Sequence, residues 1–350
     1  MTRRIWRMAK AGSLDRLSSE QEPMGELGDE TVRVAVRAVG LNFADVFACL
    51  GLYSATPAGA FVPGLEFCGV VEAVGPRVDG LRIGDRVFGL TRFGAYATRV
   101  DVEAGYVHPL PVDWSFAEGA AYPVQALTAW YAIRELGACQ AGHTVLVHSA
   151  AGGVGLHALG MLTAIGAAAV ATVGDAAKIP FLVEHAGLSR DRIIVRDRRR
   201  FAAQLDDALL AVGRKGFDLV LDAVAGPFFQ PAYRRLAPAG RMVIFGAADF
   251  MPGGRRPNWL KLAARYLSRP RVDPIEMVSE NRSVMGFNLI WMWDQAGRLT
   301  PAYTDMASMH PPAPHVGRRF PFTEAPLALQ YLQSGGSVGK VVLDVGGEPA

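Results

Sequence analysis

The stretch that most constrains this chain lies near its middle, where a run of apolar residues ends in a glycine-rich turn. Residues 144–147 have the composition of a buried β-strand, and an apolar helical pattern begins at Val154. Between them the turn reads Ala150-x-Gly152-x-x-Gly155, which differs from G-x-G-x-x-G by the alanine at the first position. Gly152 would let a pyrophosphate approach the backbone, and Gly155 would let the helix pack closely on the sheet. The pattern predicts a dinucleotide-binding unit, with a tight turn that holds no ligand as the alternative.

Composition is that of an ordinary globular protein. The 350 residues suggest two domains, and 50% of them are hydrophobic. A net charge of +3 without a basic helix argues against a nucleic-acid partner. The three cysteines form no C-x-x-C pair, which argues against a zinc knuckle or a disulfide framework and fits a reducing cytoplasm. We expect no signal peptide and no transmembrane segment.

The chain consists of two regions with different sequence patterns. Residues 1–124 contain short alternating strands and glycine turns, which is typical of a small barrel-like β domain. Beyond them, apolar strands alternate with helical stretches, which predicts an α/β doubly wound parallel sheet of the Rossmann type. The strand near 338–345 is expected to return to the first domain. The six expected strands of the parallel sheet are 145–148, 168–173, 193–195, 219–222, 242–245 and 283–289.

Motifs spread along the chain resemble those of the zinc-independent branch of the medium-chain dehydrogenase/reductase superfamily. Within that branch the chain is most similar to quinone oxidoreductases of the zeta-crystallin type and to the vesicle amine transport protein-like group, the latter through residues 281–289. The motifs occur in family order and cover nearly the whole chain. They are Val39-Gly-Leu-Asn42-Phe-Ala-Asp45, Gly51-Leu-Tyr53, Pro63-Gly64-Leu-Glu66-Phe-Cys-Gly69, Gly84-Asp85-Arg-Val-Phe-Gly89, the glycine turn, Asp222-Ala-Val-Ala-Gly226 and Gly339-Lys340-Val.

The resemblance implies a domain layout and an assembly. A GroES-like domain would comprise residues 1–124 and 310–350, and a Rossmann domain would comprise residues 125–309. A homodimer would form through the last Rossmann strand, around 284–289. The helix after the glycine turn departs from the quinone reductase signature, because Gly160 and Thr163 stand where glutamine and a basic or serine residue are usual.

The zinc ligands of the metal-containing relatives are missing here. Asn42 stands at the position of the first cysteine, Leu65 replaces the histidine, and no cysteine lies near Val124 and Gln125. Leucine cannot bind zinc, and an amide is a poor ligand beside thiolate or imidazole. We therefore expect no metal. Without a metal, alcohol oxidation is disfavoured, whereas reduction of a quinone or a conjugated C=C bond by a cofactor hydride remains feasible.

Three polar residues near the start of the chain are the catalytic candidates. The resemblance places Tyr53 where the family has an active-site tyrosine, whose phenol could donate to a substrate oxygen. Asn42 could do the same or orient the nicotinamide, or it could be a turn residue. Asp45 could orient either side chain, or it could act as a helix cap. A tyrosine at the lip of the pocket is the structural alternative for Tyr53.

Cofactor contacts are expected at the glycine turn and at the carboxyl ends of the strands. Thr128 matches a family threonine near the nicotinamide, and Lys178 matches the lysine that meets the 2′-phosphate of NADPH. Phe287, Trp291 and Trp293 could line a substrate pocket or pack in a dimer interface. The expected cofactor-binding residues are Thr128, Ala151, Gly152, Gly153, Val154, Gly174, Lys178, Ala223, Val224, Phe245, Gly246, Phe287, Asn288 and Lys340.

The end of the second Rossmann strand favours NADPH over NADH. NAD-preferring folds carry an acidic residue at the strand end for the ribose hydroxyl, and that position is Gly174. Lys178 would pair with the extra phosphate. Asp175 could repel a phosphate or bind a hydroxyl, and Arg196 could compensate, so NADH stays possible.

Three functions remain open on the sequence. The first is an NADPH-dependent reductase of quinones or α,β-unsaturated carbonyls. The second is a non-catalytic protein of the vesicle type that holds a lipid or a partner in its apolar cleft. The third is a specialised biosynthetic reductase or cyclase, which the aromatic and proline-rich region 250–315 makes possible.

Overall fold

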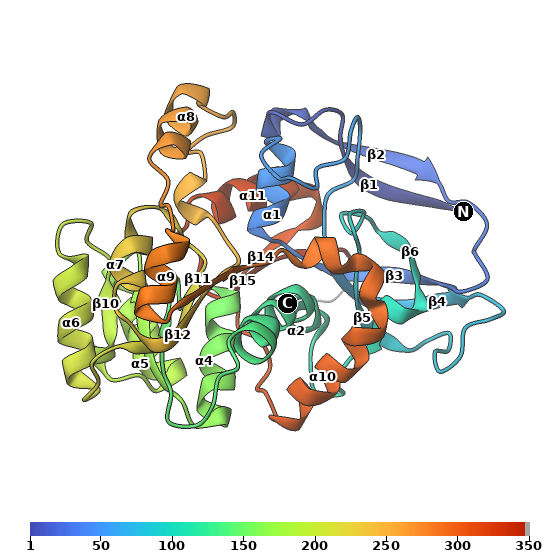
Figure 1. Cartoon of the computed structure of the whole chain (residues 1–350). Helices are drawn as coiled ribbons and strands as arrows, with labels where there is room; N and C mark the ends of the chain where they lie inside the picture. Colours follow the sequence, from blue (N-terminus) through green and yellow to red (C-terminus); the bar gives the residue numbers. More distant parts are fainter. Residues whose placement is uncertain (347–350) are drawn as a thin grey trace.

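A computed structural model describes residues 1–346, and in it the chain forms two halves (Figure 1). One half is built on a six-stranded sheet with the order β10-β9-β8-β11-β12-β13, and every neighbouring pair is parallel. This is the predicted doubly wound arrangement. The strands are β8 (Thr144–Val147), β9 (Ala168–Val173), β10 (Ile193–Val195), β11 (Phe217–Asp222), β12 (Leu236–Ile244) and β13 (Ser283–Gly286).

Sequence placed these six strands correctly and misjudged some ends. β12 starts six residues before the predicted start at Met242, because Pro238 and Gly240 near its beginning are unfavourable in a strand and hid it. β13 ends at Gly286, three residues before the predicted end at 289. The helices of this half are α3 (Pro123–Trp130), α4 (Gly153–Ile165), α5 (Ile179–Ala186), α6 (Phe201–Ala211), α7 (Phe229–Tyr233), α8 (Trp259–Leu267) and α9 (Pro274–Glu280).

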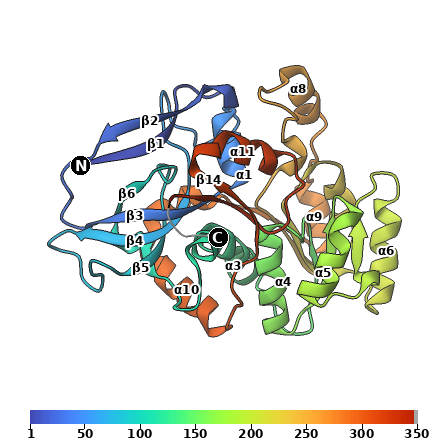
Figure 2. The same cartoon turned by 180° about the vertical axis from the view of Figure 1, so that it is seen from behind.

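The other half is a strongly curved, mainly antiparallel sheet with the order β14-β15-β3-β4-β5-β7, in which β6 also pairs with β3. A separate hairpin of β1 and β2 packs beside it (Figure 2). The predicted return of the chain end is confirmed, because β15 pairs with β3. The strands are β1 (Thr2–Met8), β2 (Leu17–Pro23), β3 (Thr31–Gly40), β4 (Glu66–Val74), β5 (Arg86–Leu90), β6 (Arg99–Glu103), β7 (Val107–Pro109), β14 (Val316–Pro321) and β15 (Lys340–Asp344).

The segment after β13 links the two halves. Trp293, in a run of 3-10 turns over Leu289–Arg298, stacks on Tyr106 of the barrel half with ring centroids 3.9 Å apart. Helix α10 (Leu299–Ser308) follows, and Tyr303 within it donates to the carbonyl of Pro123 at 3.4 Å. Pro301 is tolerated there because it lies in the first turn of α10, where an N–H has no helical partner. The remaining helices are α1 (Phe43–Cys49), α2 (Phe116–Ala120) and α11 (Ala325–Gln333).

Two further expectations can be compared with the fold. The cysteines Cys49, Cys68 and Cys139 are all buried and none is in a disulfide. Within residues 1–346, no helix combines the length and the apolar character needed to cross a membrane.

Candidate active site in the cleft between the two halves

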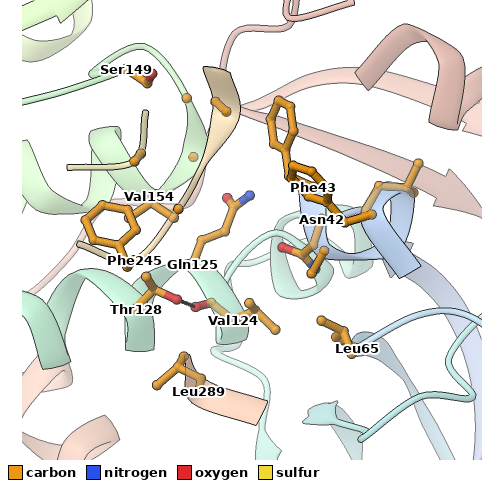
Figure 3. A pocket seen from close by; sticks show the side chains of 18 of the residues that line it. Asn42, Phe43, Leu65, Val124, Gln125, Thr128, Ser149, Val154, Phe245 and Leu289 are labelled. Carbon is orange, nitrogen blue, oxygen red and sulfur yellow. Dashed lines mark hydrogen bonds between the residues drawn. The ribbon is translucent and has the colours of Figure 1, made fainter. Parts of the chain in front are cut away.

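A cleft of about 1080 Å³ runs between the barrel half and the carboxyl ends of the parallel strands. Figure 3 shows Asn42, Phe43 and Leu65 of the barrel half facing Val154 and Phe245 of the Rossmann half, with Gln125 between them. Most of the predicted site residues line this cleft: Asn42, Tyr53, Thr128, Ala151, Gly152, Gly153, Val154, Gly174, Lys178, Ala223, Phe245, Gly246, Phe287 and Asn288.

Four of the predicted residues do not line the cleft. Asp45, Val224 and Lys340 are buried beneath its wall. Trp291 is 57% exposed on the outside, under the guanidinium of Arg92, whereas Trp293 lines the cleft. Any action of Asp45 or Lys340 on a bound molecule would therefore pass through another side chain.

The glycine turn holds α4 very close to the end of β8. A Cβ atom added at Gly155 would lie 2.6 Å from the Cα of Ala150, so only glycine fits. Gly152 caps the N-terminus of α4, and the first amides of a helix have no helical partner. Those amides and the helix dipole favour an anion at this end of the cleft.

The side chain of Gln125 packs against the glycine turn at Gly153. A Cβ atom added at Gly153 would lie 1.5 Å from Oε1 of Gln125, so the amide of Gln125 occupies the space that a side chain would take. That Oε1 is buried and has no hydrogen-bond partner within residues 1–346. A buried acceptor without a donor is costly, and a ligand N–H would satisfy it. The turn therefore fits the pyrophosphate and adjoining part of a dinucleotide.

Two cationic side chains, Lys178 and Arg196, line the same corner of the cleft. Lys178 is half-buried, and its ammonium donates to the carbonyls of Gly335 and Ser337 at 2.7 and 2.8 Å. Burial lowers the pKa of Lys178, and the nearby charge of Arg196 lowers it further. Burial also lowers the pKa of Arg196 to about 10, so the guanidinium stays charged at neutral pH.

Asp175 has a local role in the same corner. Its Oδ1 accepts from the amide of Ala177 at 2.9 Å and thereby caps a short 3-10 turn. The carboxylate keeps its negative charge and a second oxygen, and Asp175 lines the cleft. The cap therefore leaves both expected roles of Asp175 open.

Tyr53 reaches across the cleft from the loop after α1. Its hydroxyl donates to Oδ1 of Asn288, beyond the end of β13, at 2.8 Å. Burial raises the pKa of Tyr53 to about 12, so the phenol keeps its proton at neutral pH. Any substrate oxygen that accepts from Tyr53 must compete with Asn288.

A buried polar cluster lies under Asn42, and sequence reasoning missed its main member, Glu66. Lys340 donates to Oδ1 of Asn42 at 2.9 Å and also to Oε1 of Glu66. Nδ2 of Asn42 donates to the same Oε1 at 2.7 Å. The only sequence signal was an acid inside the quoted Gly64-Leu-Glu66 motif, at the start of an apolar strand.

Asp45 lies in the first turn of α1 and not beside Tyr53. Its Oδ2 accepts from the backbone N–H of Asn42 at 2.8 Å and from the hydroxyl of Tyr96 at 3.3 Å. Burial raises the pKa of Asp45 to about 7, and its buried Oδ1 has no hydrogen-bond partner within the described part of the chain. The carboxyl thus fixes the backbone from which the Asn42 side chain projects.

Thr128 and His148 are two further polar groups of the cleft wall. The Thr128 hydroxyl donates to the carbonyl of Val124 at 2.6 Å (Figure 3), which leaves its lone pairs to accept from a carboxamide. His148 directly follows β8, and its Nδ1 lies 3.0 Å from Oγ1 of Thr172. Burial lowers the pKa of His148 to about 4, so the ring is neutral, and its buried Nε2 has no hydrogen-bond partner among the residues that the structure describes.

Metal binding has no support among residues 1–346, where no group of three or more His, Cys, Asp or Glu side chains could hold an ion. The positions of the first two zinc ligands carry Asn42 and Leu65, as the sequence indicated. The space near Asn42 is instead occupied by the ammonium of Lys340.

Fold and cleft together define a two-domain dehydrogenase or reductase with a GroES-like half and a Rossmann half. A family model described as alcohol dehydrogenase GroES-like domain matches residues 28–112, and one described as zinc-binding dehydrogenase matches residues 190–343. The human synaptic vesicle membrane protein VAT-1 homolog is 30% identical over 342 residues, which are 96% of this chain and 85% of that protein. The chain belongs to the medium-chain dehydrogenase/reductase superfamily, in its quinone oxidoreductase and VAT-1-like group.

Solved structures agree with this placement. A quinone oxidoreductase of Pseudomonas syringae pv. Tomato DC3000 has a TM-score of 0.81 at 26% identity and covers 98% of this chain and 100% of that one. CurK enoyl reductase has a TM-score of 0.78 at 28% identity, with 98% and 99% covered. Mycobacterial Rv1454c complexed with NADPH has a TM-score of 0.82 at 26% identity, with 98% and 99% covered. The predicted family and fold class are confirmed, and these neighbours support an oxidoreductase that uses a nicotinamide cofactor.

Proposed function

We propose that the protein reduces a quinone or an α,β-unsaturated carbonyl compound with hydride from NADPH and without a metal ion. The observation that carries this proposal is the composition of the cleft. A glycine turn suited to a dinucleotide faces an apolar chamber in which Asn42 and Tyr53 supply the polar groups. Leu65 and Leu289 are among the apolar side chains that would exclude water from the reacting atoms (Figure 3).

The side chains can stabilise charge without a Lewis acid. NADPH, when bound, supplies a hydride to the electrophilic carbon of the substrate, and negative charge then collects on the substrate oxygen. Tyr53 remains protonated and can donate to that oxygen when it releases Asn288. No histidine–carboxylate relay was visible in the sequence, and we assign the proton that completes the product to solvent.

The preference for NADPH rests on charge. Lys178 and Arg196 line one corner of the cleft, where the two cations outnumber the single carboxylate of Asp175. A charge-assisted contact of this type contributes about 1.5–3 kcal/mol. The mycobacterial neighbour complexed with NADPH is consistent with this choice.

Assembly and compartment belong to the same proposal. β13 is the edge strand of the Rossmann sheet, and its free edge would pair with β13 of a second copy to form the expected homodimer. Three buried cysteines that form no disulfide with one another fit a reducing cytoplasm. Sedimentation of the purified protein tests the dimer directly.

A panel assay tests the activity. Loss of NADPH absorbance is followed with quinones, 2-alkenals and enones at neutral pH, and also after treatment with a chelator. We expect turnover of at least one class, unchanged by chelation. The VAT-1-like relatives favour a second candidate, a protein that binds a lipid or partner in the cleft. Cofactor binding without turnover of any panel member would reject the reductase and favour that candidate.

A further inference from the structure

The cluster of Asn42, Glu66 and Lys340 joins three distant parts of the chain. Asn42 caps α1, Glu66 begins β4 and Lys340 begins β15. Their exposed fractions are 8%, 0% and 1%. Of the three, only Asn42 lines the cleft, so the ion pair acts on the cleft through that amide.

The two charges determine which way the Asn42 amide points. Oδ1 faces the ammonium of Lys340 at 2.9 Å, and Nδ2 faces the carboxylate of Glu66 at 2.7 Å. A flipped amide would set N–H groups against an ammonium and an oxygen against a carboxylate, and both contacts would be repulsive. An asparagine between neutral neighbours would have no such preference.

Glu66 is itself held in place. Its Oε1 accepts from Lys340 and Asn42, and its Oε2 accepts from the backbone N–H of Val124 at 2.8 Å, at the start of α3. Gly40 leaves room for the pair, because a Cβ atom there would lie 2.8 Å from both Oε1 of Glu66 and Cε of Lys340. The Glu66 carboxylate is thus held in one position, from which it orients the Asn42 amide.

These bonds account for Oδ1 and for one of the two N–H bonds of Asn42. We propose that Glu66 and Lys340 are positioning residues that present the second N–H of Asn42 to a carbonyl oxygen bound in the cleft. The ion pair would make Asn42 a donor and prevent it from acting as an acceptor. This inference rests on the proposed function for the identity of the carbonyl compound, but the orientation of the amide can be tested without turnover.

The chain is well suited to a spectroscopic test, because it contains only four asparagines, Asn42, Asn258, Asn281 and Asn288. Selective side-chain ¹⁵N labelling gives four amide pairs, and Asn42→Leu identifies the pair of interest. We expect one Asn42 proton to be shielded from exchange by Glu66. The other should shift when a ligand binds. A shift with NADP⁺ alone points to the nicotinamide carboxamide, and a shift only after menadione is added points to the substrate.

The variant Glu66→Gln/Lys340→Met removes both charges together, so neither is left buried alone. The substituted glutamine can bond the Asn42 amide in either orientation, and we expect the Asn42 proton that faced Glu66 to lose its protection from exchange and to change its chemical shift. If the proposed activity holds, kcat should fall about tenfold to hundredfold with KM for NADPH near normal. Adding Asn42→Leu should then cost little more. Asp206→Asn/Arg235→Met, which removes a surface ion pair, is the control and should change neither readout.

Two results would overturn the proposal. One is a wild-type protein in which neither Asn42 proton responds to NADP⁺ with menadione, a result that does not require the variant to fold. The other is a folded charge-free variant with unchanged Asn42 signals. A wild type that turns over no panel member would reject the proposed function alone, since the NMR result would still decide the orientation of the amide.

Discussion

Replacing Gly155 by alanine tests whether close packing of α4 on the end of β8 sets the nucleotide site. The added Cβ would lie 2.6 Å from the Cα and carbonyl oxygen of Ala150, where ordinary contacts are 3.4–4 Å. Both neighbours are backbone atoms, so a side chain cannot rotate to relieve the clash. The helix must move away by about 1 Å to restore normal contact distances.

The cost follows from that displacement. Overpacking of this size destabilises a fold by about 1–3 kcal/mol. The amides of Gly152 and Gly153 would move with the helix, and a misplacement of about 1 Å can cost on the order of 100-fold at a reacting site. We therefore expect a lower urea midpoint with an unchanged slope, and weaker NADPH binding in a fluorescence titration.

Gly160 provides a matched control in the same helix. It is exposed, and a Cβ there would meet nothing within 4 Å. Gly160→Ala should therefore raise stability by about 0.5–1 kcal/mol, because alanine restricts the unfolded chain, and should leave NADPH binding unchanged. A Gly155→Ala protein with wild-type stability and wild-type NADPH affinity would refute the reasoning.

Three other substitutions test separate parts of the molecule. Tyr53→Phe should lower kcat about 10²–10³-fold with NADPH affinity near normal, and unchanged kcat would remove the phenol from the mechanism. Lys178→Glu should raise KM for NADPH at least about tenfold relative to NADH, while Lys261→Glu on the exposed face of α8 should not. Burial lowers the pKa of His108 to about 4 from 6.5, so the free energy of unfolding should fall as pH drops from 6.5 toward 4. When the free energy of unfolding is measured by urea titration at each pH, His108→Phe should reduce its loss between pH 6.5 and pH 4. The same pH dependence in the variant and the wild type would contradict the lowered pKa of His108.

Local patterns in the sequence predicted the Rossmann half well. Short apolar strands such as Ile193–Val195 and Ala168–Val173 were placed to the residue, because buried parallel strands are continuous apolar runs between glycines and helices. The turn between β8 and α4 was predicted equally well from its glycines. Backbone geometry that requires small residues can be predicted because those residues are visible in the sequence.

Contacts between residues that are far apart in the sequence could not be predicted from such local patterns. Glu66 and Lys340 are separated by 274 positions, and no periodicity relates a strand start in the first third of the chain to one at its end. The bond between Tyr53 and Asn288 spans 235 positions for the same reason. Trp291 and Trp293 were indistinguishable in sequence, because irregular 3-10 turns, and not a regular helix, decide which of them faces the cleft.

Strand β15, the last strand within residues 1–346, is a structural member of the first domain. Until β15 emerges from the ribosome, residues 38–40 of β3 lack the partner on the edge opposite β4, and Asn42 lacks the ammonium that faces it. The carbonyl of Ala151 in the glycine turn likewise lacks its hydrogen-bond donor until the N–H of Gly339 is available. An unpaired strand edge can pair with the wrong chain. A nascent chain of this protein therefore exposes a vulnerable edge for most of its translation, and chaperone engagement should concentrate in that interval.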